Sequence, residues 1–140
     1  MTLLLDTSGL YAALNPAQRS HSACAQVLRS RTGPLVLSPF VLAELDYLVL
    51  TEGGVERELA LLAEVAGGAY ELASVSADDV GEAQHIAARH RDLALGLADA
   101  SLVVLAARYH TDEVLTLDHR HFRVVAAPGG HPFRVLPADG

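Results

Sequence analysis

The sequence predicts one α/β domain over residues 1–140, with a central parallel sheet of four to five strands covered by helices on both faces. Two observations favour this class. Short apolar runs, typical of strands buried on both faces, alternate along the chain with helical stretches of about 12 residues. The hydrophobic share is 51% of 140 residues, which is enough to bury a full core in one domain.

Each expected element has a local reason. The apolar run 2–5 leaves no room for a polar face and is predicted to be a buried strand. Ser38 before Pro39, and Ser76 with Asp79, are capping signals that begin two helices. The predicted strands are 2–5, 35–37, 70–75 and 114–117, with 124–125 and 134–136 as candidates for a further edge strand. The predicted helices are 10–14, 18–31, 39–50, 55–66, 77–90 and 98–109.

Composition excludes several classes of protein. No apolar run reaches the roughly 18 residues that cross a bilayer, and no basic segment precedes the first apolar run. We therefore expect a cytoplasmic protein with no membrane partner. The single cysteine, Cys24, excludes a disulfide scaffold and is expected to be a small core residue. A formal net charge of −7, with arginine as the only strong base, argues against tight non-specific binding to duplex nucleic acid.

Four acids occupy equivalent places in this pattern. Asp6 and Asp118 each follow a predicted strand, whereas Glu44 and Asp99 lie near the starts of two mostly apolar helices. Each acid alone has an ordinary explanation as a turn residue, a helix cap or part of a solvated helix face. Because the carboxyl ends of parallel strands meet at one edge of the sheet, the four together indicate a shared pocket.

A pocket of four carboxylates predicts a metal site. Crowded carboxylates repel one another and raise one another's pKa values, and a hard divalent cation such as Mg²⁺ removes that problem. Mg²⁺ also keeps several waters, which leaves room for a phosphate and supports phosphodiester hydrolysis. No Ser-His-Asp or Cys-His pattern and no nucleophile elbow competes with this interpretation.

Four segments in fixed order span residues 3–123, namely LLLDTSGLYAAL, SPFVLAELDYL, GLADASLVVLAARY and VLTLDHRHFR. In this order and spacing they resemble the PIN-domain ribonucleases, most closely the VapC-type toxins of bacterial toxin–antitoxin pairs. The resemblance implies a PIN-like α/β/α sandwich and cleavage of RNA by a Mg²⁺- or Mn²⁺-dependent endoribonuclease. It also implies a homodimer and a cognate VapB-type antitoxin, which inserts a C-terminal segment into the acidic pocket.

The resemblance also implies residue roles. The four acids of the family fall on Asp6, Glu44, Asp99 and Asp118. The first and third are expected to ligate the metal directly, and the second and fourth to complete the catalytic pocket through water or a second metal. The hydroxyl after the first acid falls on Thr7 or Ser8, where it would hold a metal-bound water or a phosphate. Phe122 is expected to anchor its loop in the core.

The remaining signals are weaker. The two histidines of the segment His119-Arg120-His121 have no third metal ligand at a recognisable spacing, so the segment is predicted to be a solvated loop. Arg120 is a candidate RNA contact. The apolar stripe of helix 55–66, which includes Leu59 and Leu62, is predicted to be core or dimer contact.

Two other functions fit an acidic pocket. A phosphoacceptor domain also places acids at strand ends, but it needs a basic partner that is usually Lys, and the chain has no Lys. A catalytically silent PIN-like binding module, whose acidic pocket docks a basic partner, would bind no metal and cleave no RNA.

Overall fold

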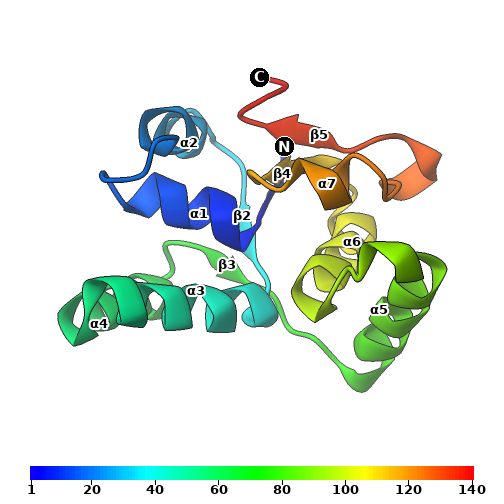
Figure 1. Ribbon diagram of the computed structural model, residues 1–140, viewed down its shortest axis with the longest axis horizontal. Helices are drawn as coiled ribbons and strands as arrows, with labels where there is room; N and C mark the ends of the chain where they lie inside the picture. The colour runs from blue at the N-terminus through cyan, green and yellow to red at the C-terminus, as the bar shows by residue number, and fades with distance from the viewer.

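The computed structural model describes residues 1–140 as a parallel five-stranded sheet flanked by helices (Figure 1). The strands are β1 (Leu3–Leu5), β2 (Leu35–Leu37), β3 (Glu71–Leu72), β4 (Glu113–Leu115) and β5 (Arg134–Leu136). The helices are α1 (Thr7–Leu14), α2 (His21–Arg29), α3 (Pro39–Gly53), α4 (Val55–Ala66), α5 (Ala77–Arg89), α6 (Leu97–Tyr109) and α7 (His119–Phe122). Two 3₁₀ segments complete the chain, η1 (Arg91–Leu93) and η2 (Pro128–Gly130).

The strand order is β3-β2-β1-β4-β5, and all neighbouring strands are parallel. Figure 1 shows α1 to α4 on one side of the strands and α5 to α7 on the other. This division follows from right-handed crossovers, because the chain reverses its direction across the sheet between β3 and β4. The predicted α/β class and parallel sheet are confirmed, with five strands.

The central strand β1 lies between β2 and β4, and its three leucines are fully buried. Both faces of this strand meet helices, so a continuous apolar run is what the position requires. Cys24 and Phe122 are also buried in the core, as the sequence predicts. No helix is long and apolar enough to cross a membrane.

Local signals place the helices that frame the edge of the sheet. The Ser38 side chain accepts a hydrogen bond from the Phe40 N–H at 3.2 Å, and Ser76 forms the predicted capping box with Asp79. The backbone of α1 at Gly9 packs directly against the backbone of β4, because a Cβ added at Gly9 would lie only 2.5 Å from the Leu115 carbonyl oxygen. This close approach holds the first turn of α1 at the carboxyl edge of the sheet.

Two strand predictions need correction. The strand expected at 70–75 is reduced to Glu71–Leu72, an exposed strand at the edge of the sheet. The last hydrogen bond between this segment and β2 is the one that the Ala73 N–H donates to the Leu37 carbonyl oxygen. The strand expected at 114–117 is Glu113–Leu115 instead. Thr116 therefore follows the strand, and Asp118 is the N-cap of α7.

The 119–121 segment is also corrected, because it is helical and His121 is buried with 8% exposure. In α4 the buried residue is Leu61, whereas Leu59 and Leu62 of the predicted stripe are 52% and 37% exposed. The core interpretation of that stripe is wrong, and its role in a dimer stays a prediction.

Candidate metal centre

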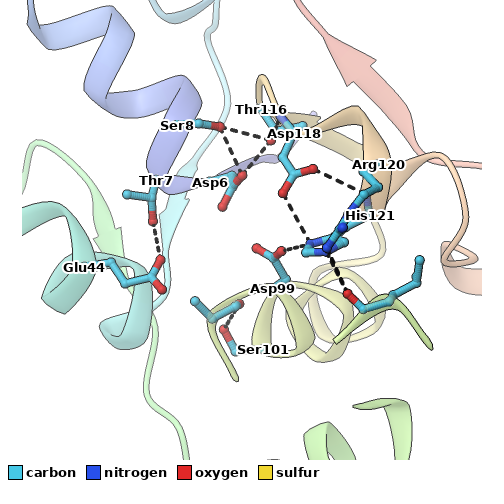
Figure 2. A network of polar contacts seen from close by, with 12 residues as sticks. Asp6, Thr7, Ser8, Glu44, Asp99, Ser101, Thr116, Asp118, Arg120 and His121 are labelled. Carbon is cyan, nitrogen blue, oxygen red and sulfur yellow. Dashed lines mark hydrogen bonds and ion pairs between the residues drawn. The ribbon is translucent and has the colours of Figure 1, made fainter. Parts of the chain in front are cut away.

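An open cleft of about 400 Å³ lies at the carboxyl edge of the sheet. Each predicted acid reaches it from a different element: Asp6 follows β1, Glu44 lies on α3, Asp99 on α6 and Asp118 at the start of α7. The hydroxyl residues that follow the first acid, Thr7 and Ser8, line the same cleft. The topology thus brings together acids that are far apart in the sequence (Figure 2).

Asp6 is the most deeply buried of these acids, with 4% exposure. Burial raises the pKa of Asp6, and the hydrogen bond from Thr116, at 2.6 Å from Oγ1 to Oδ2, opposes that rise. The Ser8 hydroxyl donates a longer bond of 3.3 Å to the same carboxylate oxygen. Thr116 Oγ1 also accepts the Asp118 N–H at 2.9 Å, so one threonine fixes the first acid and the loop that carries the fourth.

Asp99 lies in the first turn of α6 and faces both Asp118 and His121. Burial, followed by repulsion from the Asp6 carboxylate, raises the pKa of Asp99 to about 7. His121 Nδ1 contacts Asp99 Oδ2 and lies 3.3 Å from Asp118 Oδ2. One donor atom from each of these three residues lies within 4.8 Å of the others.

Glu44 faces these acids from the other side of the cleft, where Figure 2 shows it beside Thr7. The Thr7 hydroxyl donates to Glu44 Oε1 at 2.8 Å. Glu44 is solvent-exposed, in contrast to the buried Asp6. Asp46, two residues further along α3, does not line the cleft.

Arg120, the candidate RNA contact, lies beside the cleft. Its Nη2 donates to the Leu93 carbonyl oxygen at 3.1 Å and lies 3.0 Å from His121 Nε2. RNA contact by Arg120 stays a prediction.

Two residues of the centre are absent from the sequence-based set. The apolar run 114–117 predicts Thr116 to lie in the interior of a strand, although it is the polar residue of that run and follows β4 directly. The sequence predicts His121 to lie in a solvated loop. Its position three residues after a capping Asp118 is the signal that places it on the inner side of a short helix.

The donor set of the cleft fits a hard divalent cation. Four carboxylates line it and no arginine does. Burial, and to a smaller extent repulsion among Asp6, Asp99 and Asp118, raises the pKa of Asp6 and Asp99, so a cation in the cleft would favour their charged forms. Oxygen-rich sites of this kind suit Mg²⁺ or Mn²⁺.

The parallel sheet and the acidic cleft at its carboxyl edge define a PIN-like α/β protein. The chain belongs to the PIN domain family, whose model matches residues 3–128. It is 47% identical over 135 residues to Ribonuclease VapC26 of Mycobacterium tuberculosis (strain ATCC 25618 / H37Rv). This alignment covers 96% of this chain and 100% of VapC26. The crystal structure of Mycobacterium tuberculosis VapC20, a Sarcin-Ricin loop cleaving toxin, has the same fold, with a TM-score of 0.77 and 21% identity. That match covers 83% of this chain and 89% of VapC20.

Proposed function

We propose that the protein is a metal-dependent endoribonuclease that hydrolyses RNA phosphodiester bonds, and that it is the toxin of a VapBC-type toxin–antitoxin pair. The observation that carries this proposal is the cleft lined by Asp6, Glu44, Asp99 and Asp118 in a chain of the PIN domain family. The near full-length similarity to a protein named as a ribonuclease supports the activity. The fold shared with VapC20, a Sarcin-Ricin loop cleaving toxin, is consistent with it.

In this proposal Asp6 and Asp99 hold the metal directly, and Glu44 and Asp118 complete the site. A bound Mg²⁺ or Mn²⁺ ion supplies Lewis acidity toward the phosphate and lowers the pKa of a coordinated water. The chain's own part is orientation: Thr116 and Ser8 donate to Asp6, which turns its carboxylate into the edge of the cleft.

The exposed wall of the cleft is suited to water. Because Thr7 donates to Oε1 of Glu44, the Oε2 atom of Glu44 is left to accept a hydrogen bond from a water in the cleft. Thr7 and Ser8 also follow β1 closely enough to contact a phosphate bound at the same edge. We further propose that Arg120 contacts the RNA backbone from the adjacent helix.

The partners and setting of the protein complete the proposal. It acts in the cytoplasm as one PIN-like domain over residues 1–140, forms a homodimer, and is inhibited by a VapB-type antitoxin. A basic residue of that antitoxin would enter the acidic cleft and compensate the carboxylates there. No role at a membrane is proposed.

The test is cleavage of total RNA with Mg²⁺ or Mn²⁺, compared with the same reaction in EDTA. Asp6→Asn and Asp99→Asn each remove one metal-binding charge and are expected to lower cleavage more than the roughly 10–100-fold that loss of a supporting group costs. Asp78→Asn is the matched control, because Asp78 is an exposed acid in the first turn of α5. Unchanged cleavage in the Asp6 and Asp99 variants would refute the mechanism. If the wild type neither cleaved RNA nor bound metal by calorimetry, the binding-module interpretation would replace it.

A further inference from the structure

His121 is the one basic side chain that lines the acidic cleft, and its ring is buried. Figure 2 shows the ring between Asp99, Asp118 and Arg120. His121 lies close to two of the four acids, through its Nδ1 and through its backbone N–H. Its Nδ1 contacts Asp99 and lies 3.3 Å from Asp118 Oδ2, and its backbone N–H donates to Asp118 Oδ1 at 3.4 Å.

The ring's other nitrogen is occupied on the far side of the cleft. His121 Nε2 lies 3.0 Å from Arg120 Nη2 and 3.2 Å from the Leu93 carbonyl oxygen. A guanidinium only donates hydrogen bonds, so with Arg120 as partner Nε2 accepts and the ring proton is on Nδ1. A carboxylate only accepts hydrogen bonds, so in a site that holds a metal through the Asp99 carboxylate the contact with Asp99 Oδ2 is made by Nδ1–H.

The backbone that carries this ring is firmly held. Phe122 follows His121, is fully buried and packs edge-on against Phe133 with ring centroids 5.5 Å apart. Arg120, from the other side, donates to the Leu93 carbonyl oxygen in η1 at 3.1 Å. The ring of His121 therefore has a fixed position from which to direct both acids.

We propose that His121 is a positioning residue for the metal centre: its Nδ1–H orients the Asp99 and Asp118 carboxylates, and Arg120 and the Leu93 carbonyl fix its ring. This inference rests on the proposed function, since it assigns those carboxylates to a divalent cation. Hydrogen-bonded partners of this kind set the direction of a ligand's lone pairs and its basicity, and their loss typically weakens metal binding 10–100-fold.

The alternative role for His121 is direct ligation, because its ring nitrogen and the two acids lie close enough to share an ion. The contacts favour positioning. Nδ1 already donates to Asp99, and Nε2 is directed at Leu93 and Arg120 instead of the open cleft.

The experiment measures the Mn²⁺ dissociation constant by calorimetry, without RNA, for the wild type and three variants. His121→Leu removes the donor and is expected to raise the dissociation constant about tenfold or more. His121→Asn places an amide N–H near the position of Nδ1 and is expected to recover most of the affinity. His119→Leu is the control, since His119 is an exposed histidine of the same helix, and its affinity should equal that of the wild type.

A dissociation constant unchanged in His121→Leu, or equally weakened in His121→Leu and His121→Asn, would overturn the inference. Pulsed electron paramagnetic resonance of the Mn²⁺-loaded wild type gives a test that needs no variant to fold. Positioning predicts no nitrogen directly bound to Mn²⁺, and a coupling typical of a coordinated imidazole would overturn it. If the wild type bound no Mn²⁺ at all, the proposed function would fail and the inference with it, whereas normal wild-type binding with an unaffected His121→Leu defeats the inference alone.

Discussion

Thr116→Val removes one hydroxyl from the candidate metal centre and leaves the shape of a fully buried side chain nearly unchanged. In the native protein this hydroxyl donates to Asp6 Oδ2 at 2.6 Å and accepts the Asp118 N–H at 2.9 Å. The chain contains a matched control in Thr111, another buried threonine. Its hydroxyl donates to the Thr2 carbonyl oxygen at 2.6 Å and accepts the Glu113 N–H at 3.2 Å.

The two substitutions each remove a hydrogen bond, but Thr116 donates to a carboxyl group, that of Asp6, whereas Thr111 donates to a neutral backbone carbonyl. A hydrogen bond to an ionised group contributes about 1.5–3 kcal/mol to the free energy of unfolding, against about 0.5–1.5 kcal/mol for a neutral pair. Thr116→Val is therefore expected to cost the larger amount where Asp6 is ionised and the smaller amount where Asp6 is protonated. Because burial already raises the pKa of Asp6 and Thr116 opposes it, the variant raises this pKa further, and its cost grows as the pH rises.

Chemical denaturation of both variants in EDTA, at pH values from 4 to 8, measures this difference. The cost of Thr111→Val should be constant over the range, and the cost of Thr116→Val should increase. Calorimetry at pH 7.5 should show weaker Mn²⁺ binding for Thr116→Val alone, since a proton on Asp6 competes with the metal. Equal Mn²⁺ affinities in the two variants, together with a pH-independent cost for Thr116→Val, would refute the assignment of Thr116 to the Asp6 carboxylate.

Three further results are expected. Because burial raises the pKa of Asp99 to about 7 in the folded protein, against an ordinary 3.8, the free energy of unfolding in EDTA should fall as the pH rises from about 4 through about 7. Excess Mn²⁺ should reverse the fall at pH 8, and melting temperatures that rise with pH in EDTA would contradict this. Arg31→Met breaks the 2.6 Å ion pair to the buried Glu113 at the opposite edge of the sheet, and it should cost about 1.5–3 kcal/mol in urea denaturation while RNA cleavage by the folded fraction stays unchanged. Gly9→Ala places a Cβ 2.5 Å from the Leu115 carbonyl oxygen and should cost about 1–3 kcal/mol by the same measurement, and a neutral effect would mean that α1 does not approach β4 as described.

The sequence predicts the fold well where the deciding forces are local. The leucines of β1 form an apolar run with no polar face. The capping roles of Ser38 and Ser76 can be predicted from the residues that follow each of them within one helical turn. The convergence of Asp6 and Asp99 on one cleft also follows from a general property, because parallel strands share one carboxyl edge.

What the sequence leaves out depends on partners that are distant along the chain. Glu113 begins β4 although it is charged, since Arg31 and Arg134 both pair with it at 2.6 Å. The burial of His121 likewise depends on Asp99, which lies on another helix. The sequence predicts Thr116 to lie inside a strand, because an apolar run does not mark the residue at which the strand ends, and the Thr116 N–H still donates to the Leu136 carbonyl oxygen of β5 at 2.9 Å.

The strand order β3-β2-β1-β4-β5 has a consequence for the timing of synthesis. Of the five strands, β1 leaves the ribosome first although it is the middle of the sheet, and its second neighbour, β4, is made only after α6. Until then β1 has one unpaired edge, and Asp6 lacks both Thr116 and Asp118. Chains are made from the N-terminus at about 5–20 residues per second, so the four acids can meet only after Asp118 has been made. A chain that stops before Asp118, released early from a broken message, would therefore lack the complete acidic cleft.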